Sequence, residues 1–138
     1  MLGLQWRLAM IGLDTNIVVR WLVGDDRAQI EQARAAIDDV PDDLFLNVVV
    51  LVEAAWVMAG RYRADRRTIA AGLRSLLAHP RSVVLERAAI EDALTAYETG
   101  GPGLSDHLIG ALNKAAGCRT TLTFDRRAGR GPHFTAIA

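Results

Sequence analysis

The stretch LAMIGLDTN, residues 8–16, runs from an apolar segment straight into a carboxylate and two small polar side chains. The apolar segment Leu8–Leu13 predicts a buried strand, and Thr15 or Asn16 can cap a helix that follows it. Asp14 therefore stands where a strand ends and a helix begins. A lone carboxylate beside buried residues is costly without a partner, so Asp14 is either a helix cap or one member of a charged site.

Three further acids interrupt apolar segments in the same way. They are Glu53 in Val48–Gly60, Asp106 in Leu104–Leu112, and Asp125 directly after Thr121–Phe124. Each acid also has an ordinary structural explanation. The alternatives are an ion pair with Arg20 or Arg61 for Glu53, a helix-dipole position capped by Ser105 for Asp106, and a turn for Asp125.

Taken together, the four acids indicate a metal ion. Carboxylates crowded into a low-dielectric cleft repel one another and persist only when a cation neutralises them, and no matching set of Lys or Arg lies within these apolar segments. Because the chain has 1 cysteine and 3 histidines, the expected ligands are carboxylate oxygens, which suit Mg²⁺ or Mn²⁺ better than Zn²⁺. Such an ion indicates phosphoryl chemistry, in which a water molecule is oriented for attack.

The chain has 138 residues with a net charge of zero, and 51% of the residues are hydrophobic. This size and balance predict one soluble domain over residues 1–138 with a sizeable core. No apolar run approaches the ~18 residues that span a bilayer, and Cys118 alone cannot form an internal disulfide. We therefore expect a cytoplasmic protein without a membrane segment. Because the net charge is zero, a polyanion would have to be held by a local patch.

Strands and helices are predicted to alternate along the chain. The expected strands are Leu8–Leu13, Leu44–Val48, Val83–Leu85, Thr120–Phe124 and a short Phe134–Ile137. The expected helices are Ile17–Val23, Asp25–Asp38, a segment from after Val48 to Gly60, Asp65–His79, Ala88–Tyr97 and Ser105–Ala116, with Trp21 and Trp56 in the core. This alternation predicts an α/β fold with a mainly parallel central sheet covered on both faces. Ligands of such folds bind beyond the carboxyl ends of the strands, where the four acids can meet.

Four short segments together resemble the motifs of PIN-domain ribonucleases, most closely those of the VapC toxins of bacterial type II toxin–antitoxin modules. They are LDTN at residues 13–16, VEA at 52–54, LSDHLI at 104–109 and LTFD at 122–125. The likeness covers nearly the whole chain, from Met10 to Ile137, and implies a three-layer α/β/α PIN-like fold with a mainly parallel central sheet. Because the family begins almost directly with its first strand, Met1–Ala9 is either an N-terminal extension or a misassigned start.

The resemblance also implies a role for each matched residue. Asp14, Asp106 and Asp125 would hold Mg²⁺ or Mn²⁺, Glu53 would complete the catalytic acids, and Asn16 and Thr123 would support the metal ligands. The implied reaction is hydrolysis of an RNA phosphodiester by activated water, without a covalent enzyme intermediate. The implied partners are the RNA substrate, a cognate antitoxin protein and a second copy of the chain in a homodimer.

Two clusters of arginine accompany the motifs. The first contains Arg61, Arg63, Arg66 and Arg67, and the second contains Arg126, Arg127 and Arg130. The second cluster follows Asp125, where it could contact RNA phosphates beside the metal. A solvated polar loop explains the same arginines equally well. His107 is expected to point away from the neighbouring Asp106, because adjacent residues do not share a helix face.

Three other classes of protein also fit part of the pattern. A haloacid-dehalogenase-like phosphatase has an Asp after its first strand, but it needs a second Asp where this chain has Asn16. A phospho-accepting receiver domain needs paired acids and a lysine after its last strand, and the only lysine here is Lys114. A catalytically silent PIN-like module that binds RNA or protein would carry the same motifs, so this alternative stays open.

Overall fold

The computed structural model describes residues 9–137, so the possible extension or misassigned start, Met1–Ala9, lies outside the described residues except for Ala9. By its internal contacts the chain forms two compact units. Within the described range, unit 1 contains residues 9–64 and 72–84, and unit 2 contains residues 65–71 and 85–137. Each motif acid belongs to one unit: Asp14 and Glu53 to unit 1, Asp106 and Asp125 to unit 2.

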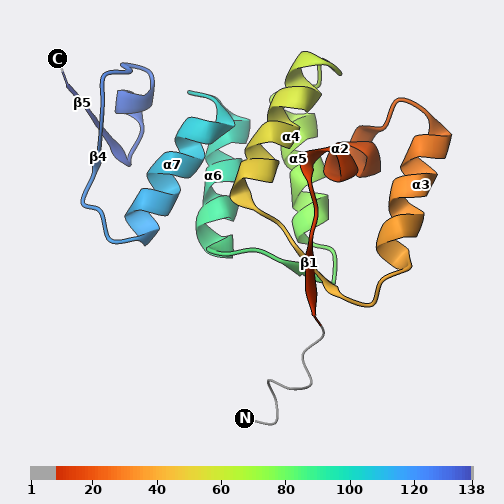
Figure 1. Ribbon diagram of the computed structural model, residues 1–138. Helices are drawn as coiled ribbons and strands as arrows, with labels where there is room; N and C mark the ends of the chain where they lie inside the picture. The colour runs from red at the N-terminus through yellow and green to blue at the C-terminus, as the bar shows by residue number, and fades with distance from the viewer. Residues whose placement is uncertain (1–8, 138) are drawn as a thin grey trace, which may run out of the picture. The chain divides into compact units, whose positions relative to one another are not determined.

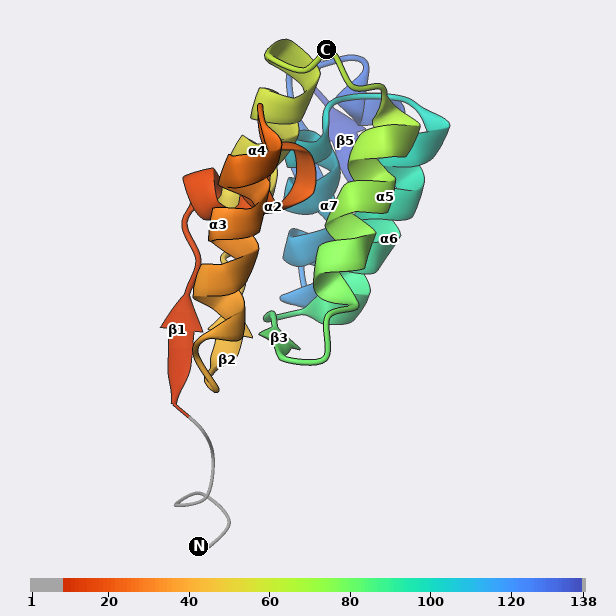
Figure 2. The same cartoon turned by 90° about the vertical axis from the view of Figure 1, so that its right-hand side faces the viewer.

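Unit 1 is built on a parallel three-stranded sheet in the order β1-β2-β3 (Figure 2). The strands are β1 (Met10–Gly12), β2 (Asp43–Phe45) and β3 (Ser82–Val83). Leu44 lies in the middle strand, where it is fully buried and pairs with Ile11 on one side and Ser82 on the other. The sheet therefore places the carboxyl ends of β1 and β2 side by side, where the chain continues toward Asp14 and toward the helix that carries Glu53.

Three helices complete most of unit 1. They are α2 (Thr15–Val23), α3 (Arg27–Asp38) and α4 (Val48–Gly60), and α2 packs against both of the others. Their contacts bury Val18, Val19, Ala33, Ile37, Leu51, Ala54, Ala55 and Met58. Because α2 follows Asp14 and α4 carries Glu53, this packing holds the first two motifs against each other.

Helix α5 (Arg66–Leu77) is shared between the units, with its first residues in unit 2 and Gly72–Leu77 in unit 1. The rest of unit 2 begins with α6 (Arg87–Thr99) and α7 (Leu104–Ala115), which lie side by side in Figure 1 and pack on each other. Their buried residues include Ile90, Ala93, Leu94, Leu108 and Ala111.

The C-terminal part of unit 2 contains the short helix η1 (Ala128–Arg130) and the strands β4 (Thr121–Thr123) and β5 (Phe134–Ala136). The two strands pair in parallel, with Thr121 opposite Phe134, and η1 packs against both of them. Because β4 and η1 flank Asp125, this packing sets the position of the fourth motif acid.

The predicted fold class is confirmed. All three strand pairs are parallel, and helices separate the strands along the chain, as in a three-layer α/β/α fold. The parallel strands form a three-stranded sheet in unit 1 and a two-stranded sheet in unit 2. Every predicted helix and strand is present, and the differences concern their ends.

At three of these ends, the structure shows which side chain sets the boundary of the helix or strand. Helix α2 is capped by Asp14, not by Thr15 or Asn16, because the Asp14 carboxylate accepts the amide of Ile17. Helix α3 begins at Arg27 instead of Asp25, because Asp26 accepts the amide of Gln29. The strand predicted to reach Val48 ends at Phe45, because Asn47 caps α4 by accepting the amide of Val49. These three caps follow the same rule, an Asx side chain at the helix N-terminus.

Two further predictions were wrong. Ser105 does not cap α7, because the helix already begins at Leu104, where Leu104 and Leu108 are buried one turn apart. Trp56 is not in the core, since 64% of it is exposed, whereas Trp21 is half-buried and packs edge-on against His79. Between residues 9 and 137, no helix has both the length and the apolar character needed to cross a membrane.

Candidate active site

Asp14 stands at the junction of β1 and α2. Its Oδ1 accepts the Ile17 amide at 3.0 Å, and its backbone carbonyl accepts the amide of Val18, so the residue is fixed by the first turn of α2. The side chain is exposed and borders a surface hollow that Phe45 and Asn47 also line. Only one carboxylate oxygen of Asp14 is used for capping within the described residues, which leaves Oδ2 for a ligand.

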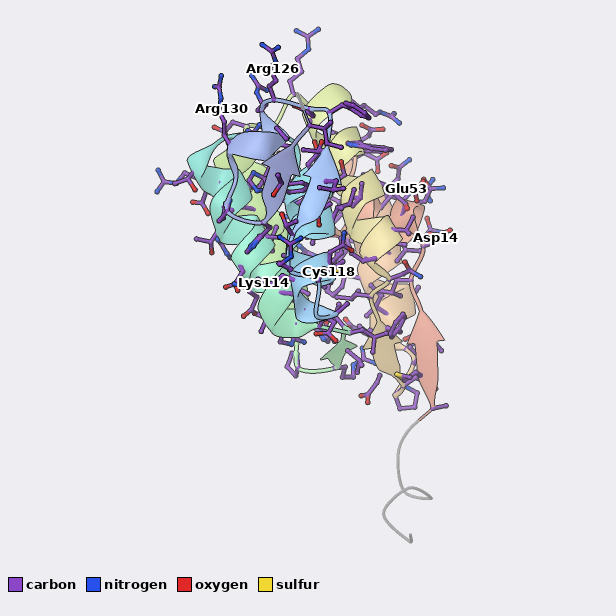
Figure 3. The ribbon with its side chains drawn as sticks, turned by 90° about the vertical axis from the view of Figure 1, so that its left-hand side faces the viewer. Asp14, Glu53, Lys114, Cys118, Arg126 and Arg130 are labelled. Atoms are coloured by element: carbon purple, nitrogen blue, oxygen red, sulfur yellow. The ribbon has the colours of Figure 1, made fainter. Side chains whose placement is uncertain are left out.

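Glu53 is held by α2 across the helix interface. The Thr15 hydroxyl donates a hydrogen bond of 2.7 Å to Glu53 Oε1. Because Thr15 follows Asp14 directly, the two carboxylates lie near each other, and Figure 3 shows both labels on the same side of unit 1. The alternative of an ion pair between Glu53 and Arg20 or Arg61 is wrong, since Thr15 is the partner and Arg61 pairs with Asp25.

Asp106 occupies the first turn of α7, where the helix dipole favours a negative charge. Its side chain is half-buried and makes no hydrogen bond or ion pair with other residues in the described part of the chain. Both oxygens of this carboxylate are therefore left for a ligand. As predicted, His107 points elsewhere: its Nε2 lies 2.9 Å from the carbonyl oxygen of Gly100.

The loop before α7 is fixed by Arg66, which the sequence indicated only as one of four clustered arginines. Its guanidinium donates to four carbonyl oxygens, those of Tyr97, Gly100, Gly101 and Pro102, at 2.8–3.1 Å. It also lies over the ring of Tyr97, with Cζ 4.6 Å from the ring centroid. Arg66 therefore joins the C-terminus of α6 to the loop that leads to Asp106.

Asp125 is fixed by a local turn after β4. Its Oδ1 accepts the amides of Arg127 at 2.8 Å and Ala128 at 3.2 Å, while its own amide donates to Thr123 Oγ1 at 3.0 Å. Asp125 is therefore a turn residue, which was the structural alternative considered for it. The second carboxylate oxygen of Asp125 takes no part in these bonds. The hydrogen bond from the Asp125 amide to Thr123 Oγ1 gives Thr123 a direct contact with this turn.

The remaining candidate residues are on the surface. Asn16 is exposed in the first turn of α2 and makes no side-chain hydrogen bond among residues 9–137. Arg126, Arg127 and Arg130 are exposed beside Asp125, and Figure 3 shows Arg126 and Arg130 extending outward at the same end of unit 2. Their side chains have no ion-pair partner within the described range.

The available donors suit a hard divalent cation. Asp14, Asp106 and Asp125 each offer at least one carboxylate oxygen, and Mg²⁺ and Mn²⁺ prefer such ligands. Within either unit, the described residues contain no group of three or more His, Cys, Asp or Glu side chains that could hold a metal ion. Each unit thus supplies two of the four motif acids, and neither unit supplies a complete set of ligands by itself.

Two residues with structural roles were missed in the sequence. Thr15 was considered only as a helix cap, although its position beside Asp14 was a visible signal. Arg66 carried no signal that distinguishes it from Arg61, Arg63 or Arg67, because its partners are main-chain oxygens more than 30 residues away.

Comparison with known proteins bears on the whole arrangement. The family model of the PIN domain matches residues 11–132, which include all four motif acids and parts of both units. No curated protein matches the chain significantly. PIN domains are generally nucleases that use divalent metal ions, so the match supports a hydrolase that acts on nucleic acid. With the match extending over most of its length, the chain belongs to the PIN domain family.

Proposed function

We propose that this chain is a Mg²⁺- or Mn²⁺-dependent endoribonuclease and the VapC-like toxin of a toxin–antitoxin pair. Asp14, Asp106 and Asp125 hold the ion, Glu53 completes the acidic set, and Asn16 and Thr123 support the ligands. The proposal requires that both units belong to one PIN-like domain in which the four carboxylates act together. The observation that carries it is the PIN family match over all four motifs, together with unused carboxylate oxygens on the proposed ligands.

The structure supports this chemistry through the state of the acids. Thr15 links the Asp14 and Glu53 segments, and Asp106 has no competing protein partner among the described residues. When bound, Mg²⁺ would neutralise the carboxylates and the charge that develops on the scissile phosphate. The residues themselves orient the site: Thr123 fixes the Asp125 main chain, and capping by Asp14 fixes its carboxylate at the sheet edge.

A matched pair of helix caps tests the role of Asp14. Asp14 and Asp26 both cap a helix by accepting the amide three residues later. Asparagine caps a helix about as well as aspartate, so Asp14→Asn and Asp26→Asn should both remain folded. Asp14→Asn should reduce cleavage of an RNA panel by about a hundredfold or more, as expected when a group that stabilises a charged transition state is lost. Asp106→Asn should have the same effect, whereas Asp26→Asn should leave cleavage unchanged.

Metal dependence is tested with the same RNA panel. The purified chain without a partner should cleave in Mg²⁺ or Mn²⁺ and stop in EDTA, and added Mn²⁺ should restore cleavage. Equal cleavage with and without EDTA would contradict the metal mechanism. A folded chain that binds RNA without cleaving it in any divalent ion would favour the silent PIN-like module.

The toxin assignment has its own test. We expect expression of the chain in the bacterial cytoplasm to arrest growth, and co-expression of a small DNA-binding antitoxin from the neighbouring gene to restore it. We also propose a homodimer, which light scattering of the purified chain would detect. Growth unaffected by an active chain would contradict the toxin role while leaving the nuclease activity in place.

A further inference from the structure

A polar pocket of about 360 Å³ lies in unit 1, and its lining includes Asn16, which follows Asp14 and Thr15 in the chain. It is bounded by α2, α3 and α4, and its polar lining consists of Asn16, Arg20, Asp25, Gln29, Arg61 and Tyr62. We propose that this pocket binds a backbone phosphate of the RNA substrate, away from the scissile phosphate, through Arg20 and Arg61. The inference rests on the proposed ribonuclease function and adds a substrate-binding site to it.

The position of the pocket follows from the faces of two packed helices. On α2, Asn16 and Arg20 are four residues apart, and Glu53 and Val57 on α4 and Arg61 at its C-cap follow one another at the same spacing. Residues four apart lie on one helix face, so both series run along the interface where α2 packs on α4. The Thr15–Glu53 hydrogen bond lies at one end of this interface, and the pocket extends from Asn16 and Val57 to Arg61, which is about 12 Å from Glu53 along the helix axis.

The charges in the pocket suit an anion. Arg20 and Arg61 are exposed, and the only acid in the lining is Asp25, so the pocket carries one net positive charge. Guanidinium groups bind phosphate oxygens in a bidentate manner. Because the protein has no net charge, a local pair of arginines is the kind of patch that can hold a polyanion.

Asp25 now occupies the position that a phosphate would take. Its Oδ2 lies 2.6 Å from Arg61 Nη2, with both side chains substantially exposed. Partial desolvation, followed by a hydrogen bond to Asp25 and the charge of that carboxylate, raises the pKa of the Tyr62 hydroxyl, while Arg61 and Arg20 act in the opposite direction. The four groups therefore interact as one cluster. A phosphate would exchange with Asp25 for Arg61, whose guanidinium also lies over the Tyr62 ring, with Cζ 5.7 Å from the ring centroid.

The test measures binding of a short fluorescein-labelled oligouridylate by anisotropy in EDTA, so that binding is read without cleavage. Arg20→Ala and Arg61→Ala should each weaken binding about tenfold, as expected for loss of a charge-assisted hydrogen bond. Each should also reduce the slope of log K against log salt by about 0.7. The control is Arg34→Ala, an exposed arginine on α3 that does not line the pocket, and it should change neither quantity.

Asp25→Asn gives a change in the opposite direction. It removes a carboxylate that competes for Arg61 and repels phosphate, so RNA binding should tighten about fivefold. Far-UV circular dichroism would verify that each variant is folded, which is expected because the side chains of Arg20, Asp25, Arg34 and Arg61 are all exposed. Weaker RNA binding by Asp25→Asn would contradict the proposed exchange.

The failure of this inference differs from failure of the proposed function. If the unsubstituted chain binds no RNA, the ribonuclease proposal itself is contradicted. If it binds RNA equally well with Arg20→Ala, Arg61→Ala and Arg34→Ala, the pocket is not an RNA site. Binding of an oligoglutamate peptide that only the first two substitutions abolish, with RNA binding unchanged, would assign the pocket to an acidic protein partner instead.

Discussion

In unit 1, Glu53 and the segment that carries Asp14 are joined by one hydroxyl across 38 residues of sequence, whereas in unit 2 each acid is held separately. Asp125 is fixed by the turn that it forms itself, and Asp106 is placed by a loop that Arg66 holds. The first arrangement depends on the packing of α2 on α4, and the second on residues that carry no motif. Similar motif acids are thus positioned by different interactions, which can be removed one at a time.

Arg66→Ala should have the largest effect on stability. It removes four hydrogen bonds from a partly buried guanidinium and its contact with the Tyr97 ring, and we expect a loss of about 2–4 kcal/mol in the free energy of unfolding. Arg61→Ala removes an exposed ion pair with Asp25 and a contact with the Tyr62 ring, whose centroid is 5.7 Å from Arg61 Cζ, and should cost no more than about 1–2 kcal/mol. Urea unfolding of both variants measures the difference.

Equal losses for the two arginine variants would show that the loop before α7 is held by something other than Arg66. Nuclease activity provides a second measurement, since Arg66→Ala should lower cleavage by displacing Asp106. Arg66→Lys should recover only part of the stability, because an ammonium group cannot reproduce the planar fork of donors.

Gly129→Ala should have the next largest effect, by disturbing the η1 helix after Asp125. A Cβ atom at this position would lie 2.5 Å from the Ala136 Cβ, 3.2 Å from its Cα and 3.3 Å from its amide nitrogen, none of which belongs to a flexible side chain. Overpacking of this kind costs about 1–3 kcal/mol. Gly60→Ala is the matched control in unit 1, because nothing lies within 4 Å of its Cβ position.

The control should move in the opposite direction. Gly60 is the last residue of α4, where alanine favours the helix and should raise the free energy of unfolding by up to about 1 kcal/mol. Thermal and urea denaturation would measure both variants. If Gly129→Ala is as stable as the unsubstituted chain, β5 and η1 can separate without cost, and the position of Asp125 depends on its turn alone.

Local patterns were enough to predict most of the fold. The apolar run before Asp14, the alternation of strands and helices, and the acids after β1 and β4 all follow from short-range preferences of the chain. The Asx caps at Asp14, Asp26 and Asn47 obey a local rule as well, although the exact capping residue was misplaced for the first helix. The ends of the helices and strands were predicted least accurately, because neighbouring polar residues could each have capped the same helix.

Long-range partners could not be predicted from sequence. Arg66 bonds to carbonyl oxygens, which every residue possesses, so no partner residue type marks the interaction. Trp56 was assigned to the core because α4 is apolar on nearly every face. The sequence of α4 therefore does not indicate which face is exposed. Thr15 contacts Glu53 only because α2 packs on α4, which is a property of the folded unit.

Thr15→Val should have a smaller effect that is specific to unit 1. It keeps the shape of the side chain but removes the hydrogen bond to Glu53, which at an exposed site contributes about 0.5–1.5 kcal/mol. A double-mutant cycle with Glu53→Gln in urea isolates the coupling between the two residues. Thr15→Ser should retain the bond, and a coupling energy near zero would mean that helix packing alone holds the two motifs together.

The smallest expected effect concerns Asp65, which precedes Arg66 at the start of α5. The amide of Thr68 donates to its carboxylate at 2.8 Å, and this bond, followed by the Thr68 hydroxyl and the charge of Arg67, lowers the pKa of Asp65, against a small opposing desolvation. A lowered folded-state pKa stabilises the protein above the unfolded-state pKa of about 3.9, and the contribution disappears as the pH falls through the folded-state value.

Asp65→Asn retains a capping side chain but cannot titrate. The unsubstituted chain should therefore be slightly more stable than Asp65→Asn near neutral pH, and the two urea midpoints should converge in acid. The direction of this change is the informative part, because Asp65 is fully exposed and its contribution is small. A stability difference that grows as the pH falls would mean that the carboxylate is protonated more easily in the folded chain, so the Thr68 amide could not be its main partner. The start of α5 would then be held by other contacts. Because Arg66 follows Asp65 directly, the position of Arg66, and through it that of Asp106, would depend on those contacts as well.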